Sequence, residues 1–156
     1  MKLYMKQKVF TFNDRFTIKD EDGNDRYRVE GELFSFMKKL HIYNMEEREV
    51  AFIQQKFVFG MPKFKVFVEE EEIAEVKQKL TFFKPKFEIY GKNWEVNGNI
   101  WGHEYIISDS EGEVANIKKE WMTWGDSYLI DISTNQDEIS VMAVVLAIDA
   151  VMTNRS

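Results

Sequence analysis

A nine-residue pattern that alternates between apolar and polar residues recurs along the chain. Clear copies beginning Glu-Val-Ala or Glu-Ile-Ala occupy residues 49–57, 72–80 and 113–121, and looser copies occupy 27–33 and 94–100. The last apolar residue of each copy follows that of the previous copy by 24, 23, 20 and 21 residues. A spacing in the low twenties is typical of a repeated two-stranded unit, and alternation with period two predicts strands rather than helices.

Each repeat also supplies a turn and a partner strand. Turn-forming residues precede copies of the pattern at 21–24, 91–93 and 109–112. A further alternating segment lies upstream of each copy, at 16–18, 40–43, 64–68, 87–90 and 105–107. Five hairpins make ten strands, and residues 3–6 and 128–132 add one strand at each end. The sequence therefore predicts twelve strands.

The C-terminal segment 139–152 is the only long apolar run, since all of its residues except Ser140 and Asp149 are apolar. As a helix it would be about 21 Å long, against roughly 30 Å of hydrocarbon in a bilayer, and Asp149 would be costly at membrane depth. A helix that is apolar on every side must instead be enclosed. Twelve strands about 4.8 Å apart and tilted near 40° close into a cylinder roughly 24 Å across, which a helix can fill.

We therefore expect one mainly β domain over residues 1–156, an antiparallel barrel of about twelve strands in hairpin repeats that encloses a hydrophobic helix at roughly 136–153. Asn135 or Asp137 is expected to cap the helix. The equivalent inward position of the five copies should be buried, at Val29, Ile53, Val76, Val96 and Ile117. Small inward residues should leave room for the helix, at Ala51, Ala74 and Ala115.

Composition excludes several classes of function. The chain has 21 Lys and Arg against 27 Asp and Glu, so its net charge of −6 opposes binding to nucleic acid. The absence of cysteine removes disulfides, thiol nucleophiles and thiolate metal sites. No apolar run near the N-terminus is long enough for a signal peptide, so we expect a cytoplasmic protein. The sequence has neither a phosphate-binding glycine-rich loop nor a GxSxG nucleophile motif.

Five segments of the chain carry a family resemblance: MKQKVF at 5–10, FTIKD at 16–20, LTFFKPKF at 80–87, KEWMTWGD at 119–126 and AID at 147–149. They resemble the LURP-one-related family, in particular its bacterial YxjI-like branch. Five hairpin units followed by an enclosed helix are similar to the tubby C-terminal-like fold. The resemblance implies a closed barrel of twelve strands around a central helix, and it implies little about activity. Tubby proteins bind phosphoinositides through basic residues and phospholipid scramblases are regarded as relatives, but none of tubby's lipid-binding residues can be placed at a position of this chain.

The polar candidates favour structural roles. His41 and His103 are 62 positions apart, with no metal-ligand spacing around them. The acidic segment 20–25 lacks the glycine and the bidentate glutamate that a calcium loop needs at fixed positions, so a solvated hairpin turn is expected. The glutamates at 69–72 are expected to form a soluble turn between two strands.

Asp149 leaves two interpretations open. A lone acid in an apolar helix is a buried carboxylate of the kind that marks a functional site. It could equally emerge at a mouth of the barrel and pair with a strand-end lysine, with Arg155 or with a backbone donor. The structural interpretation is favoured.

Two corners marked by proline, 60–65 and 82–87, mix lysine with aromatic residues. Such clusters suit an anionic membrane surface, where lysine meets the headgroups and phenylalanine enters the interface. The candidate ligand-binding residues are therefore Lys63, Lys84 and Lys86. In the alternative interpretation, the neighbouring phenylalanines point into the barrel and the lysines solvate its outside; these phenylalanines are Phe64, Phe82 and Phe87.

These features predict a non-enzymatic binding module for a phospholipid, an anionic membrane surface or a small hydrophobic anion. The alternative is a scaffold or regulatory protein-interaction domain without a small ligand. No nucleophile–base pair can be assembled from the sequence, so no catalytic residue, cofactor or metal ion is expected. The expected location is cytoplasmic and peripheral at the membrane.

Overall fold

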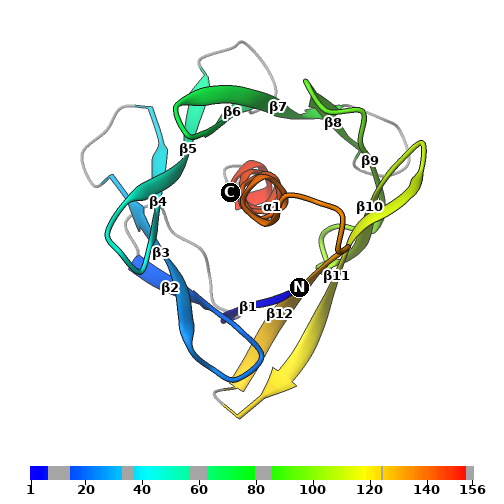
Figure 1. Ribbon diagram of the computed structural model, residues 1–156. Helices are drawn as coiled ribbons and strands as arrows, with labels where there is room; N and C mark the ends of the chain where they lie inside the picture. The colour runs from blue at the N-terminus through cyan, green and yellow to red at the C-terminus, as the bar shows by residue number, and fades with distance from the viewer. Residues whose placement is uncertain (7–14, 33–36, 57–62, 80–85, 124, 154–156) are drawn as a thin grey trace.

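The computed structural model describes residues 1–6, 15–32, 37–56, 63–79, 86–123 and 125–153. These residues form twelve strands in a closed antiparallel barrel around one helix, as the sequence predicts (Figure 1). The strands are β1 (Lys2–Lys6), β2 (Arg15–Lys19), β3 (Asp25–Gly31), β4 (Lys39–Asn44), β5 (Glu49–Lys56), β6 (Lys63–Val68), β7 (Glu71–Lys79), β8 (Lys86–Tyr90), β9 (Glu95–Asn99), β10 (Glu104–Asp109), β11 (Gly112–Met122) and β12 (Gly125–Ile132), and the helix is α1 (Glu138–Thr153).

The first and last strands close the barrel. β1 runs antiparallel to β12, from the pair Lys2–Asp131 to the pair Lys6–Ser127. The amino group of Met1 donates a hydrogen bond to the Ile132 carbonyl at 3.0 Å, which extends this seam by one residue. Every other strand pairs with its neighbours in the chain, so the predicted hairpins follow one another around the wall without a crossover.

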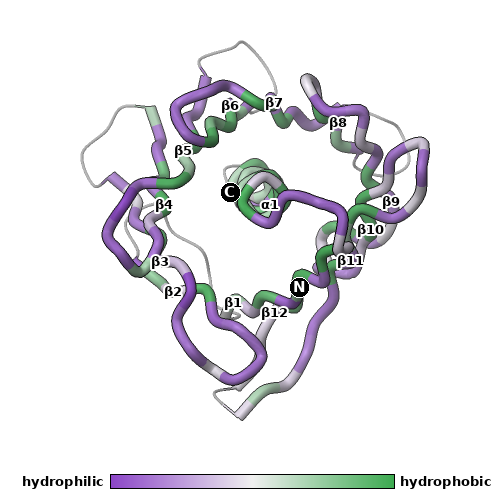
Figure 2. Tube along the Cα trace, in the orientation of Figure 1, coloured by the Kyte–Doolittle hydropathy of each residue, from purple (hydrophilic) through white to green (hydrophobic). Residues whose placement is uncertain are grey.

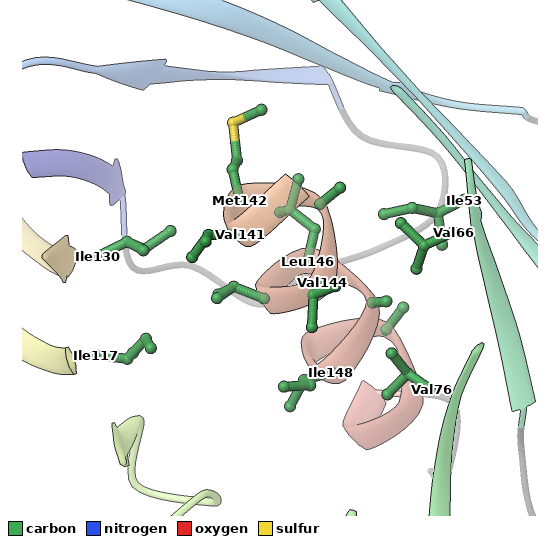
Figure 3. Packing of buried hydrophobic residues seen from close by; sticks show 14 of the residues in the cluster. Ile53, Val66, Val76, Ile117, Ile130, Val141, Met142, Val144, Leu146 and Ile148 are labelled. Atoms are coloured by element: carbon green, nitrogen blue, oxygen red, sulfur yellow. The ribbon is translucent and has the colours of Figure 1, made fainter. Parts of the chain in front are cut away.

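The helix lies inside the barrel, and its apolar side chains leave it in several directions. Figure 3 shows Met142, Leu146 and Ile148 leaving the helix in different directions, with residues of several strands around them. All side chains from Ser140 to Met152 are buried. A helix with no solvent-exposed face gains nothing from an amphipathic pattern, which is why the run is apolar throughout. No helix in the described part of the chain has the length and apolar character needed to cross a membrane.

Small side chains bring the helix toward one wall. α1 packs most extensively on β5, β6 and β7. Ala51 on β5 and Ala74 on β7 are buried there, as predicted, and a small side chain allows a helix to approach the sheet closely. Ala115 on β11 is buried as well.

Polar groups fix the N-terminus of the helix. Asp137 is the cap: its Oδ2 accepts hydrogen bonds from the Ser140 N–H at 3.2 Å and from the Ser140 hydroxyl at 2.5 Å. Glu138 in the first turn accepts a hydrogen bond from the Tyr27 hydroxyl and lies 3.5 Å from Arg26. Of the two caps that the sequence allowed, the structure selects Asp137.

The predicted inward register is confirmed for four of the five repeats. Val29, Ile53, Val76 and Ile117 are at most 1% exposed. Val96 on β9 is only half-buried, although it packs against the core. β9 is also the strand whose pairing with β8 is sparse, because Glu88 and Glu95 form the one register pair between them in the described part of the chain.

The up-and-down topology gives the barrel two ends with different connections. At one end, here called the helix-entry end, the chain turns at 20–24, 45–48, 69–70, 91–94 and 110–111 and then enters the helix through 133–137. Figure 2 shows these turns as mostly hydrophilic. The other end, here called the far end, receives the ends of β1, β3, β5, β7, β9 and β11 and the C-terminus of α1.

Candidate functional site

Two of the three predicted lysines lie at the far end and face outward. Lys63 begins β6 and Lys86 begins β8, while Lys84 lies outside the described residues. The neighbouring Phe64 and Phe87 are buried in the barrel, so the structure supports the alternative interpretation for these two rings. Phe82 lies outside the described residues. Phe64 and Phe87 therefore do not contribute to the predicted surface cluster of lysines and aromatic rings.

The lysines belong to a larger set that sequence analysis did not recognise. Basic residues occupy six of the seven strand ends that β2 to β8 present at the far end, and Gly31 is the seventh. The six are Arg15, Lys39, Lys56, Lys63, Lys79 and Lys86. This set, here called the basic ring, became visible only once the strand boundaries were known.

The basic ring includes two pairs of lysines directly opposite each other on neighbouring strands. Lys56 pairs with Lys63, and Lys79 pairs with Lys86. Like charges at directly opposed positions destabilise a strand pair. The opposed lysine pairs by themselves therefore do not stabilise the sheet.

Glu75 partly neutralises the basic ring. Its carboxylate lies 2.8 Å from the Lys63 amine and 3.5 Å from the Lys56 amine, and Lys65 is 3.9 Å away. Burial would raise the pKa of Glu75, but the hydrogen bond from Lys63 and the nearby lysine charges outweigh burial and lower it. Glu88 similarly lies 3.2 Å from Lys79. No ion pair involves Lys86 in the described part of the structure.

Exposed tryptophans lie at the same end. Trp121, near the end of β11, is 74% exposed, and Trp101, in the turn after β9, is 46% exposed. Indole rings are favoured where an apolar body and a polar N–H meet different environments, as at a membrane interface. The sequence carries this signal in the segment WMTW at 121–124.

The helix-entry end carries the opposite charge. Its turns contain exposed acids at Glu21, Asp22, Glu46, Glu47, Glu69, Glu70 and Glu111. Among these turns Arg48 is exposed and lies 2.8 Å from Glu69, and Lys92 is partly exposed. The described turns of the helix-entry end are thus mainly acidic, whereas the ends of β2 to β8 at the far end are mainly basic.

Asp149 pairs with a histidine, a partner that the sequence analysis did not name. His103 Nε2 lies 2.8 Å from Asp149 Oδ1, and the His103 ring stacks on Tyr128 with centroids 3.9 Å apart. Burial and, secondarily, the Asp149 charge raise the pKa of Tyr128 to about 12, and the same causes raise the pKa of Tyr105. His103 has a positive φ of 56°, which turns its side chain inward from the β9–β10 turn. The group ties the last turns of α1 to the wall, which is the structural interpretation.

His41 is held between two carboxylates on the outer face of the barrel. Its Nδ1 lies 2.9 Å from Glu49 and its Nε2 lies 2.9 Å from Glu32. Burial lowers the pKa of His41, but the hydrogen bonds that its ring donates to Glu49 and Glu32 outweigh burial and raise the pKa. With both ring nitrogens donating, the imidazolium is the favoured form and neither nitrogen is left to bind a metal.

The suspected calcium loop is a hairpin turn. Asp20 Oδ1 accepts hydrogen bonds from the N–H groups of Asp22 and Asn24, at 3.0 and 2.9 Å, in place of coordinating a cation. These backbone hydrogen bonds, chiefly the one from Asn24, lower the pKa of Asp20. In the described ranges, no group of three or more His, Asp or Glu side chains is arranged to hold a metal ion.

Described residues line two of the cavities on the wall of the barrel. One, of about 390 Å³, lies on the outer face of β4 to β6 between His41, Phe52, Phe67 and the acidic turn at Glu70. The other, of about 580 Å³, lies between β8 and β9. Both volumes fall in the range of natural ligand sites.

A twelve-stranded antiparallel barrel closed around one buried helix defines the tubby C-terminal-like class. A protein of Arabidopsis thaliana of known crystal structure shares this fold, with a TM-score of 0.67 over 97% of this chain and 90% of that chain, at 16% sequence identity. The LURP-one-related family model matches residues 1–149. The chain therefore belongs to the LURP-one-related family.

A bacterial relative supports this membership along the whole sequence. The Bacillus subtilis protein YxjI, described as uncharacterized, is 35% identical over 154 residues. The match covers 99% of this chain and 95% of YxjI. The resemblance to the YxjI-like branch is confirmed.

Proposed function

We propose that this chain is a non-enzymatic barrel domain that docks its far end on an anionic membrane surface. The observation that carries the proposal is the basic ring, which concentrates lysines at one end of a chain whose net charge is −6. A lysine close to an anionic membrane surface contributes about 1 kcal/mol of attraction. Lys63 and Lys86 belong to this surface, and Lys84 is assigned to it from the sequence.

The tryptophans and the acidic turns give the docked molecule an orientation. Trp121 and Trp101 at the far end supply the amphipathic rings that sit at the headgroup level. The acidic helix-entry end would be repelled by the same surface and would face away from it. Because Glu75 and Glu88 compensate part of the basic ring, the expected binding is weak and depends strongly on salt.

The test is co-sedimentation with vesicles of phosphatidylcholine alone or mixed with phosphatidylserine. Replacing three lysines together with glutamine, as Lys63→Gln, Lys84→Gln and Lys86→Gln, should reduce binding to the anionic vesicles by about two orders of magnitude. Raising salt from about 0.1 M to 1 M should have a similar effect, because the Debye length falls from about 10 Å to 3 Å.

A matched control removes three lysines at the helix-entry end, as Lys2→Gln, Lys19→Gln and Lys92→Gln. This control has the same net charge as the far-end variant. If vesicle binding depended on net charge alone, both variants would bind anionic vesicles equally weakly. We expect the control to bind like the parent. Equal losses in both variants, or no preference of the parent for anionic vesicles at low salt, would contradict membrane docking.

A second candidate function is a scaffold or regulatory domain that binds protein and no small ligand. It is favoured by exposed apolar side chains away from the far end, at Tyr90 and Ile106. If the protein does not bind anionic vesicles at low salt, the scaffold or regulatory function is favoured over membrane docking.

A further inference from the structure

Aromatic rings form a row on the outer face of the barrel, where polar side chains are expected. Phe52 lies outward on β5, between the buried Ala51 and Ile53. It is directly opposite His41 on β4 and Phe67 on β6, and its ring centroid lies 4.9 Å and 5.8 Å from theirs. Neither phenylalanine belongs to the hydrophobic core of the described residues, so burial in that core does not explain this aromatic row.

The aromatic row, His41, Phe52 and Phe67, borders the cavity of about 390 Å³ on β4 to β6. Both phenylalanines are only partly buried, so part of each ring is accessible. Three glutamates line the same cavity, Glu49 at the start of β5 and the exposed Glu69 and Glu70 of the β6–β7 turn. None of the described residues that line it is a lysine or an arginine.

The two turn glutamates are poorly suited to the turn itself. Glu69 and Glu70 connect β6 to β7, and their φ values are 50° and 69°. A two-residue hairpin turn with both φ values positive favours Asn-Gly, because most residues with a Cβ are strained in this region. Turn chemistry therefore does not explain why carboxylates stand at this side of the cavity.

The charges around the cavity leave a surplus of negative charge. Glu69 lies 2.8 Å from Arg48, and Glu49 lies 2.9 Å from the Nδ1 atom of His41. Glu70 makes no ion pair with any residue that the structure describes. Even when His41 is protonated, the three carboxylates of the lining thus face two cationic groups.

We propose that this cavity binds a soluble organic ammonium ion, and that a quaternary trimethylammonium group fits it best. A cation above an aromatic ring is attracted by the ring's quadrupole, and this attraction is larger when the cation is desolvated. The methyl groups would contact Phe52 and Phe67, and Glu70 would supply the opposite charge. The volume of about 390 Å³ leaves room for a short chain attached to the ammonium group.

Other classes of ligand suit this lining less well. An anion would meet the surplus negative charge, and a neutral apolar ligand would gain nothing from the carboxylates. A primary ammonium ion is strongly hydrated and would lose more of its hydration on the aromatic row. The acidic turn that borders the cavity belongs to the helix-entry end and not to the end proposed to dock on a membrane, which favours a soluble ion over a lipid headgroup.

The test is an NMR titration of the intact chain with choline and with 3,3-dimethylbutan-1-ol, in which a carbon atom replaces the charged nitrogen. Choline should shift the amide signals of residues 49–52 and 67–70, and the uncharged alcohol should bind at least about tenfold more weakly. Absence of these shifts at millimolar choline would overturn the proposal. Equal binding of the alcohol would also overturn it, because the cavity would then recognise apolar bulk and not charge.

Two substitutions locate the binding site. Phe67→Leu keeps an apolar side chain but removes the ring, and it should weaken choline binding by about fivefold. Glu70→Gln should weaken it by about threefold. Glu111→Gln is the matched control, because it removes an exposed carboxylate from another turn of the helix-entry end, and it should bind choline like the parent. Equal losses in the two glutamate variants would contradict the assigned cavity.

His41 supplies a signature that a purely structural aromatic row would not show. Three carboxylates and two cationic side chains lie around it: Glu30, Glu32, Glu49, Arg28 and Lys39. A bound cation repels the imidazolium, so choline should lower the pKa of His41, and choline affinity should rise as pH increases through that pKa. The His41 ring signals, followed against pH with and without choline, measure this. An unchanged pKa at saturating choline would place the cation away from the aromatic row.

A vesicle experiment distinguishes the soluble ion from a lipid headgroup with the same ammonium group. The parent should not sediment with vesicles of phosphatidylcholine alone. Sedimentation with these vesicles that Phe67→Leu abolishes would overturn the soluble ion in favour of the headgroup. The titrations with choline contain no membrane, so their failure is separate from a failure of docking on anionic vesicles.

Discussion

The two ends of the barrel differ in charge for different reasons. At the helix-entry end, part of the acidity is turn chemistry: side-chain oxygens of Asp20, Asn44 and Asp109 each accept two backbone N–H groups of the turn that follows. At the far end the lysines cap no turn in the described structure, and two pairs of them oppose each other. Turn chemistry thus explains Asp20 and Asp109 but not the exposed glutamates of the helix-entry end. At the far end carboxylates pair with every residue of the basic ring except Lys86 among the described residues, so the directly opposed lysines are what make this end the candidate for function.

The comparison also shows how little net charge says about a surface. A chain of net charge −6 opposes a phosphate-rich partner only on average. In an up-and-down barrel, successive strand connections lie at opposite ends. The two ends can therefore differ in charge even when the net charge of the chain is negative. Substitutions in the middle of the helix and near each of its ends test whether the two ends of the barrel are independent regions or parts of one cooperative unit.

The largest effect is expected from a charge in the middle of the helix. Val145 is buried between the two ends, and Val145→Asp would place an unpaired carboxylate in the core. The free energy of unfolding should fall by several kcal/mol, with loss of soluble protein as the extreme result. Thermal unfolding monitored by circular dichroism measures it, with Val145→Ala as the control for lost volume.

Val145→Asp also tests the cooperativity of the two ends. Because α1 contacts strands along its length, hydrogen-exchange protection should fall at both ends together. A soluble Val145→Asp protein that melts near the parent temperature would mean that the helix is not enclosed.

An intermediate effect is expected at the far end of the helix. Asp149→Asn removes the charge that holds His103 and should cost about 2 kcal/mol, because a hydrogen bond to a charged group is lost in a buried place. The pKa of Tyr128 should fall below about 12 but stay above its usual value, since burial is the larger cause of the shift. An ultraviolet titration of tyrosine ionisation measures this.

Glu138→Gln is the counterpart of Asp149→Asn at the helix-entry end. It removes the partner of Tyr27 and Arg26 and should cost about 1 kcal/mol. Each substitution should loosen hydrogen exchange mainly at its own end. Identical exchange maps would show that the two ends respond as one unit.

The smallest effect is expected at His41. Its two carboxylate partners come from opposite ends of the barrel: Glu32 follows β3 at the far end, and Glu49 begins β5 at the helix-entry end. The pKa of His41 is raised in the folded protein, so its stabilisation is complete below the unfolded pKa near 6.5 and is lost as pH rises through the folded value. His41→Gln should therefore lower stability at pH 5 to 6 by a few tenths of a kcal/mol and have little effect at pH 9. Urea unfolding across this pH range measures the difference, and a loss that grows with pH would contradict the imidazolium.

The fold was accessible from the sequence because its signals are local and repeated. Period-two alternation at Ala74, Val76 and Gln78 determines which face of β7 turns inward, and all three are buried. The apolar run of the helix could be satisfied only by enclosure. Val96 departed from the pattern because its burial depends on how β8 meets β9, and that depends on a like-charge pair contributed by two different strands.

The sequence by itself determined the hairpin repeat, the number of strands, the inward register and the enclosed helix, because side-chain period and hydrophobicity act on neighbouring residues. Only the tertiary structure decided that Asp149 meets His103 across 46 residues and that Glu88 lies opposite Glu95 between β8 and β9. It also decided that lysines at the ends of separate strands lie together at one end of the barrel. These arrangements depend on which residues, distant in the sequence, become neighbours when the strands pair into a closed barrel. The local sequence pattern of a single strand does not contain that information.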